Sequence, residues 1–179
     1  PLLRALGDHA IPKLPHFKPE EFSIMIYSLG LLNYRHHDLL KAVVEFAPRM
    51  LPQFSTQNIS NLLHGLGLVT FDRDDAFVCT VASHLASRIS QCSAQDVANP
   101  VTALMRLCIR HDELLATIAG HVTDPSSNLP LSIFTSQELA NTVYAFDALQ
   151  VFSRPLFEGI SVETSKRLEE FIPQEVANV

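Results

Sequence analysis

The chain has 179 residues, of which 47% are hydrophobic and 18% are charged, and its formal net charge is −6. This composition belongs to a folded chain with a substantial core, and the negative charge argues against a domain that coats itself in nucleic acid by bulk electrostatics. No apolar run reaches the roughly 18 residues that a membrane-spanning helix needs, so we expect no membrane partner.

Five segments of the sequence align with one another. They are FKPEEFSIMIYSLGLL from Phe17, FSTQNISNLLHGLGLV from Phe54, CSAQDVANPVTALMRL from Cys92, FTSQELANTVYAFDAL from Phe134 and FIPQEVANV from Phe171. Their starts are 37, 38, 42 and 37 residues apart. A shared period of this length is typical of a solenoid, in which each repeat is one supersecondary unit that buries its core against its neighbours.

The predicted fold is therefore all-α, an α-solenoid of tandem helix-hairpin repeats of about 37–38 residues. In chain order, we expect the end of a preceding repeat at 1–16, repeat 1 at 17–53, repeat 2 at 54–91, repeat 3 with a loop insertion at 92–133, repeat 4 at 134–170, and the start of repeat 5 at 171–179. Because the sequence lacks an initiator methionine and stops within a repeat, we expect it to be a segment of a longer protein.

Capping residues mark where the first helix of each repeat begins. Ser55, Ser93 and Thr135 can each accept a backbone N–H, and Asn, Asp or Glu follows three residues later, as in a capping box. Proline takes the next position in the other two repeats, which suits the first residue of a helix. The first helices are predicted to begin near Pro19, Thr56, Ala94, Ser136 and Pro173. The second helices are predicted to begin near Asp38, Asp75, Glu113 and Pro155, with candidate caps at Asp74 and Asp112.

Apolar residues spaced four and then three apart give each first helix one stripe for the core. The stripe is Phe22, Ile26 and Leu29 in repeat 1; Ile59, Leu63 and Leu66 in repeat 2; Val97, Val101 and Leu104 in repeat 3; and Leu139, Val143 and Phe146 in repeat 4. A column of small residues is expected to let neighbouring helices approach closely: Ser23, Ser60, Ala98 and Ala140.

Three features depart from the regular pattern. Pro100 lies inside a predicted first helix and should kink or delay it, and Pro48 should bend or shorten a second helix. The extra residues at 124–133 should form a surface loop, a natural place for an insertion to meet a partner.

The three cysteines, Cys79, Cys92 and Cys108, have no CxxC spacing and lie within apolar patterns, which favours buried free thiols.

The pattern F-x-x-Q-x-[LIV]-[AS]-N resembles the octotricopeptide repeats of green algae and the similar heptatricopeptide repeats of apicomplexan and related organelle proteins. It is carried by Gln57, Asn61, Gln95, Asn99, Gln137, Asn141, Gln174 and Asn178, and the resemblance covers the chain from Phe17 onward. It implies a mitochondrial or plastid factor that acts in RNA stability, processing or translation, or that is built into an organellar ribosome. These families commonly have an aromatic residue, often Trp, in mid-helix, where this chain has Tyr27, His64, Thr102 and Tyr144.

Columns along the first helix supply the first candidate RNA-binding residues. The Gln and Asn columns lie one turn apart on one face and scarcely vary, which suits either an inter-repeat hydrogen-bond ladder or uniform contacts with RNA through Asn61, Asn99 and Asn141. The next column varies and includes rings that could stack on bases, at Tyr27, His64 and Tyr144, or that could pack in the core or groove. Both alternatives remain open for each column.

Four arginines supply a second candidate surface, because Arg35, Arg73, Arg110 and Arg154 recur in the turn between the two helices. Stacked hairpins would place their guanidinium groups along one edge, as phosphate binding requires, together with His36, His37 and His111. Aspartates lie beside them, at Asp38, Asp74, Asp75 and Asp112, so a solvated edge with local ion pairs is an equal alternative.

The sequence contains no GxSxG, no phosphate-cradling glycine loop and no HExxH, so we expect no enzyme, no cofactor and no metal site. The predicted function is a non-catalytic RNA-binding component of an organellar ribonucleoprotein, either a mitochondrial ribosome subunit or an RNA processing or stability factor. Its partners would be ribosomal RNA or organellar mRNA and other proteins of the assembly. The alternative is a protein-interaction scaffold without direct RNA contact, which the negative charge favours.

Overall fold

The computed structural model describes residues 1–69 and 74–179. Within these two ranges the chain folds into ten α-helices and five short 3-10 helices, with no strand. This confirms the all-α prediction. No helix in the described ranges is long and apolar enough to cross a membrane.

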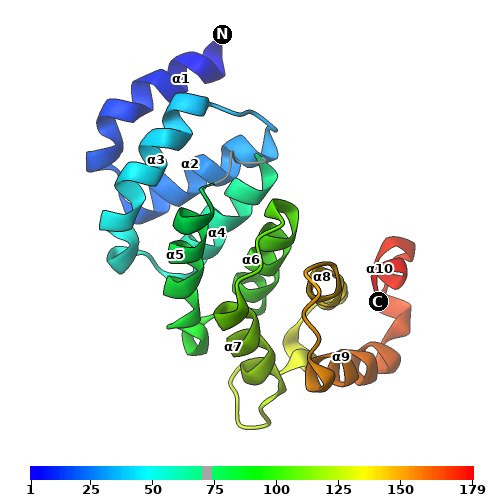
Figure 1. Cartoon of the computed structure of the whole chain (residues 1–179). Helices are drawn as coiled ribbons and strands as arrows, with labels where there is room; N and C mark the ends of the chain where they lie inside the picture. The colour runs from blue at the N-terminus through cyan, green and yellow to red at the C-terminus, as the bar shows by residue number, and fades with distance from the viewer. Residues whose placement is uncertain (70–73) are drawn as a thin grey trace.

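The even-numbered helices pack in succession and form what we call the inner row. They are α2 (Pro19–Leu31), α4 (Thr56–Leu68), α6 (Ala94–Leu107), α8 (Ser136–Ala148) and α10 (Pro173–Asn178). The odd-numbered helices form an outer row, in which each also contacts the next. They are α1 (Leu2–Ala10), α3 (His37–Met50), α5 (Asp75–Ala86), α7 (Asp112–Thr123) and α9 (Arg154–Lys166). In Figure 1 the outer row follows the outside of a bend and the inner row lies along its inside.

A 3-10 helix leads from each outer-row helix toward the next inner-row helix. These short elements are η1 (Ile11–His16), η2 (Leu51–Gln53), η3 (Ile89–Gln91), η4 (Leu131–Ile133) and η5 (Leu168–Glu170). Each ends on the aromatic or cysteine residue at which the sequence repeats begin, and Phe54, Cys92, Phe134 and Phe171 are all buried there.

All five inner-row helices begin at the predicted residues, and the predicted capping boxes are present. The Ser55 hydroxyl accepts the Asn58 N–H at 3.1 Å, and the Asn58 side-chain oxygen accepts the Ser55 N–H at 3.0 Å. Ser93 with Asp96, and Thr135 with Glu138, form the same pair. Local cap chemistry therefore fixes where this row starts.

The outer-row helices begin at the predicted residue or one residue earlier, but one predicted cap is wrong. Asp112 is the first residue of α7, and the cap is His111, whose Nδ1 accepts the Leu114 N–H at 3.1 Å. His36 caps α3 in the same way, accepting the Leu39 N–H at 3.2 Å. Both histidines are buried, so they belong to the structure of the turn and do not lie on an exposed edge with the arginines.

The core lies between the two rows, and every residue of the predicted apolar stripes is buried in it. The column of small residues, which was predicted to let neighbouring helices approach closely, is also buried, from Ser23 at 0% exposed to Ala98 at 2%. Gly65 marks a close approach between neighbouring inner-row helices. A Cβ atom there would lie 2.7 Å from the Ile26 carbonyl carbon and the Tyr27 nitrogen, so the α4 backbone rests directly on the α2 backbone.

The structure tests the expectations about irregular positions in part. Helix α6 starts at the predicted residue and continues through Pro100, and α3 reaches 14 residues with Pro48 inside it, so Pro100 does not delay its helix and Pro48 does not end α3. The segment at 124–133 lies mainly at the surface, as expected, and Leu129 and Leu131 anchor it in the core.

The cysteines differ from one another. Cys92 is buried, and burial, with a smaller effect of the Asp96 charge that Arg88 opposes, raises its pKa to about 12. Cys79 is half-buried. Cys108 is exposed, because it ends α6 in the left-handed conformation at φ 53°. The expectation of a buried thiol is therefore confirmed for Cys92 and wrong for Cys108.

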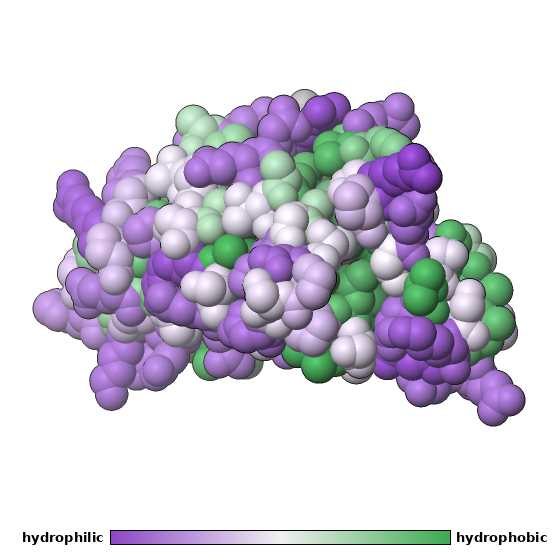
Figure 2. All heavy atoms as spheres, turned by 90° about the horizontal axis from the view of Figure 1, so that it is seen from below, coloured by the Kyte–Doolittle hydropathy of each residue, from purple (hydrophilic) through white to green (hydrophobic). Residues whose placement is uncertain are grey.

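Apolar side chains remain exposed at both ends of the helix rows. Leu2, Leu6 and Leu32 are exposed at the N-terminal end, and Val162, Leu168, Ile172 and Val176 at the C-terminal end. Seen from the side of α7 and α9, the surface is mainly hydrophilic, with apolar patches toward the C-terminal half (Figure 2).

Candidate nucleic-acid interface

Matching positions of the inner-row helices carry uncharged polar and aromatic side chains, which we call the inner strip. Its members are Tyr27 on α2; Gln57, Asn61 and His64 on α4; Gln95, Asn99 and Thr102 on α6; and Gln137, Asn141 and Tyr144 on α8. Residues three and four apart share one face of a helix. The glutamines are exposed, the asparagines are half-buried, and Tyr144 is 47% exposed.

Two aromatic rings of the strip meet across adjacent helices. The centroids of Tyr27 on α2 and His64 on α4 lie 5.5 Å apart with an interplanar angle of 86°, an edge-to-face contact. The close approach at Gly65 brings the two helices together beside this pair. Both rings are only half-buried, so each keeps surface on which a flat apolar group could stack.

The strip continues from α4 to α6 through His64. Burial is the main cause that lowers the pKa of His64 below 6.5, the nearby charge of Arg106 adds to this, and a side-chain hydrogen bond with Asn99 opposes it. His64 Nδ1 has no hydrogen-bond partner among the described atoms. That nitrogen is buried, so a ligand would meet the half-buried face of the imidazole ring rather than Nδ1.

Apart from the His64–Asn99 bond, the described hydrogen bonds between inner-row helices involve residues outside the predicted Gln and Asn ladder. The Asn58 side-chain nitrogen donates to the Ser23 hydroxyl at 3.4 Å, and the Thr56 hydroxyl donates to the Asp96 carboxylate at 3.2 Å. In the described part of the chain, the Asn61 and Asn141 side chains make no hydrogen bond. Their amide groups are therefore available to a ligand.

The arginine edge is neutralised at its C-terminal half by local ion pairs. Arg110 Nε lies 2.6 Å from the Asp112 carboxylate, and its Nη1 donates to the Gln150 carbonyl at 3.1 Å. Arg154 Nε lies 2.7 Å from Glu158 on the next turn of α9. Arg73 lies outside the described residues. Since paired guanidinium groups have less charge to offer a phosphate, this half of the edge matches the ion-pair alternative.

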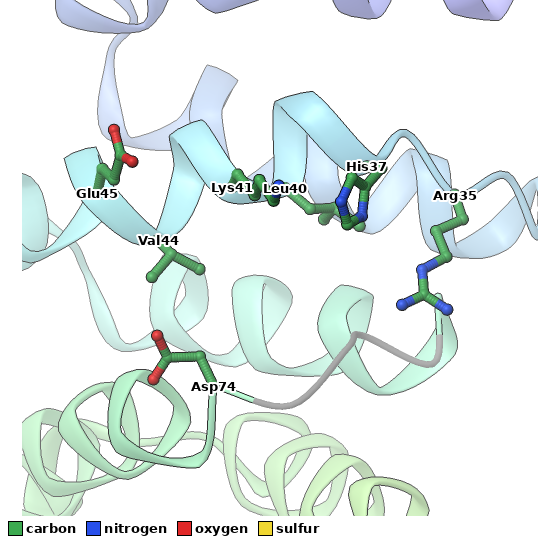
Figure 3. A pocket seen from close by; sticks show the side chains of 7 residues that line it. All are labelled: Arg35, His37, Leu40, Lys41, Val44, Glu45 and Asp74. Carbon is green, nitrogen blue, oxygen red and sulfur yellow. The ribbon is translucent and has the colours of Figure 1, made fainter.

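Arg35 lines a cleft of about 560 Å³ between α3 and α5. Figure 3 shows Arg35, His37 and Lys41 coming from α3 and the turn before it, with Asp74 across the cleft at the start of α5. Glu45 also lines it, so two carboxylates balance the arginine and the lysine. Among the described residues that line it, the cleft is therefore mixed in charge, without the net positive charge that phosphate binding favours.

Two arginines that sequence analysis missed have a clear structural role. Arg88 donates to the Phe54 carbonyl, and Arg167 Nη2 donates to the Phe134 carbonyl at 2.6 Å. Each joins the end of a predicted repeat to its own first residue, 34 and 33 positions earlier. The similar spacing from Phe54 to Arg88 and from Phe134 to Arg167 was the feature of the sequence that could have indicated this role. These guanidinium groups fix the start of an inner-row helix.

Lowering the pH from about 7 to about 5 is expected to destabilise the wild type more than a His64→Gln variant. Burial lowers the pKa of His64 in the folded chain, so the unfolded chain takes up the proton first once the pH falls below 6.5. Unfolding is then favoured until the pH also lies below the folded pKa. Above 6.5 both forms are neutral and the residue contributes nothing. Urea midpoints of both chains across this range measure the difference, and parallel pH profiles would contradict it.

Among the described residues, no group of three or more His, Cys, Asp or Glu side chains is arranged to hold a metal ion. No protein-family model matches the chain, and no curated protein matches it. The resemblance to octotricopeptide and heptatricopeptide repeats therefore stays a prediction.

Proposed function

We propose that this chain is an α-solenoid that binds single-stranded RNA along the inner strip, as a non-catalytic component of an organellar ribonucleoprotein. The proposed compartment is the mitochondrion, with the plastid as the alternative, and the assembly is a ribosome or an RNA processing or stability complex. Its RNA is ribosomal or messenger RNA of the organelle, and its other partners are proteins of the assembly.

The Tyr27–His64 pair is the observation that carries this proposal. Two half-exposed rings on adjacent helices, followed by Asn99 on the next helix, give the combination of stacking surface and amide groups with which proteins hold unpaired bases. A duplex hides its base faces, so such a strip suits single strands. Since the net charge is −6 and Arg110 and Arg154 are paired with carboxylates, this proposal assigns the affinity to contacts with bases and not to neutralisation of phosphates.

Replacing Tyr27 and Tyr144 with alanine tests the proposal. Each lost stacking contact should weaken binding by about 1–3 kcal/mol, or roughly 5- to 150-fold, without changing the slope of log affinity against log salt. Fluorescence anisotropy with a labelled single-stranded RNA measures both quantities. Urea midpoints of the variants must stay near the wild-type value; a large loss would instead place the rings in the core.

A four-fold variant with Arg35, Arg73, Arg110 and Arg154 changed to glutamine is the matched control. If each contacted a phosphate, the salt slope would fall by about 0.7 per arginine. We expect a small change, because Arg110 and Arg154 are already paired with carboxylates. If the four-fold variant lost RNA binding and the tyrosine variants kept it, the RNA-binding surface would be the arginine edge and not the inner strip.

The alternative function is a protein-interaction scaffold without direct RNA contact. It is favoured by the exposed apolar residues at the C-terminal end, where Phe152 is 77% exposed and Val162 and Leu168 are each 58% exposed. Absence of RNA binding by the wild-type chain, together with its incorporation into a ribonucleoprotein, would establish this alternative.

A further inference from the structure

An apolar groove of about 590 Å³ lies at the N-terminal end of the inner row, between α1 with η1 on one side and α2 on the other. Leu6, Phe17, Met25, Ser28 and Leu32 are among its lining residues. Leu6 is 55% exposed and Leu32 is 59% exposed. An apolar surface of this kind marks a contact that is not filled within the described chain.

The α2 face of the groove corresponds to the face with which α4 and α6 each contact the helix before them. Gly65 of α4 rests on α2 in this way, and Ala103 of α6 rests on α4 at Gly67. Ala145 takes the same position in α8, and both alanines are buried. The equivalent residue of α2 is the small Ser28, which lines the groove.

At a second repeat position, the residue is buried at the end of the later inner-row helices and exposed at the end of α2. Val69, Leu107 and Leu149 end the inner-row helices α4, α6 and α8, and they are 2%, 6% and 8% exposed. Leu32 is their counterpart after α2 and is 59% exposed. Helix α2 therefore carries the small and apolar residues of a helix contact but lacks the preceding helix that would cover them.

The order of elements indicates where the covering helix belongs in the chain. The sequence PLLRAL from Pro1 is similar to PLFEGI from Pro155, and each segment begins 16 residues before the start of a repeat, at Phe17 or Phe171. Helix α1 also occupies the outer row, where it contacts α3. Each later outer-row helix directly follows an inner-row helix, as α9 follows α8.

We propose that the groove is covered by one further inner-row helix that precedes α1 in the same polypeptide. This helix would be amphipathic, about as long as α2, and would carry small residues where it meets α2, as α2 carries Ser23 and Gly30 against α4.

An extended chain tests the proposal. Residues 134–154 are fused directly before Pro1, so that a copy of α8 and its turn precede α1 as they precede Pro155. Covering the groove should raise the urea midpoint by about 1 M. Leu32→Glu should reverse that gain in the extended chain and leave the midpoint of the 179-residue chain nearly unchanged, because the side chain is exposed there.

The matched control carries Ala140→Arg in the added segment alone, at the small position that faces the next helix. It has the same length, and it should lose the gain because the arginine prevents close approach. An unchanged midpoint in the extended chain, or an equal effect of Leu32→Glu in both chains, overturns the proposal.

Two further measurements distinguish other occupants of the groove. Peptide 134–154 added separately at micromolar concentration should give no comparable rise; an equal rise would assign the groove to a separate partner protein and overturn the proposed source. Analytical ultracentrifugation should show the 179-residue chain as a monomer. Self-association that Leu32→Glu abolishes would assign the groove to a second copy. Neither measurement depends on whether the chain binds RNA.

Discussion

Replacing Leu63 with alanine is expected to lower the free energy of unfolding by about 2–5 kcal/mol. Leu63 is 0% exposed at the centre of α4, which contacts α2, α5 and α6. Neighbours on three sides hold the surrounding side chains in place, so the core cannot collapse into the space that the leucine leaves. The cost therefore includes a cavity as well as the lost burial of apolar surface.

Urea denaturation of the wild type and the variant measures this cost directly. Leu168→Ala is the matched control, because it removes the same atoms from a side chain that is 58% exposed. The control should change stability by no more than about 0.5 kcal/mol. Equal midpoints for Leu63→Ala and the wild type would show that the core between the inner and outer rows is wrongly described.

Two glycine substitutions are expected to change stability in opposite directions. Alanine at Gly65 should destabilise the chain by about 1–3 kcal/mol, because its Cβ would lie 2.7 Å from backbone atoms of α2, which cannot rotate away as a side chain can. A Cβ atom added at Gly120 in α7 would meet no other atom within 4 Å. Gly120→Ala should therefore stabilise the chain by about 0.5–1 kcal/mol through helix propensity alone.

Thermal or urea unfolding of the two variants in parallel gives the comparison, since both add the same methyl group to a helical glycine. If Gly65→Ala also stabilised the chain, α2 and α4 could not lie as close as the structure places them. The Tyr27–His64 contact depends on that approach, so the same result would remove the physical basis of the inner strip.

The starts of the inner-row helices could be predicted because cap chemistry is local. Ser55 and Asn58 meet within one turn of the same helix, and nothing elsewhere in the chain is needed to bring them together. The stripes of the core could be predicted for a related reason, because helical spacing alone places residues such as Leu63 on one face.

The caps of the outer row could not be predicted with the same success. Histidine is an unusual N-cap, and Asp112 beside it has the more typical side chain. Which of the two residues takes the non-helical backbone conformation depends on the preceding turn, and His111 does so at φ −117°. The exposure of Cys108 has a similar origin in a left-handed residue that no pattern of apolar spacing reports.

The candidate site depended on contacts between segments that are distant in sequence. The sequence showed acids beside the arginines, and the pairing of Arg110 with Asp112 is local, but the bond from Arg110 to the Gln150 carbonyl requires two turns to be adjacent. The role of Arg88 likewise rests on a contact 34 residues away. The sequence alone shows that the repeat position of Tyr27 and His64 varies and includes aromatic rings. The edge-to-face contact of the two rings depends on how α2 packs against α4, which the sequence does not show.

Mapping the protein residues that crosslink to bound single-stranded RNA is the most direct test of the proposed interface. The wild-type chain is irradiated with a photoreactive RNA, digested and analysed by mass spectrometry. We expect crosslinks on the inner-row peptides that contain Tyr27, His64 and Tyr144. Crosslinks confined to the turns that carry Arg110 and Arg154, or none above the level of an unrelated acidic protein, would contradict RNA binding along the inner strip.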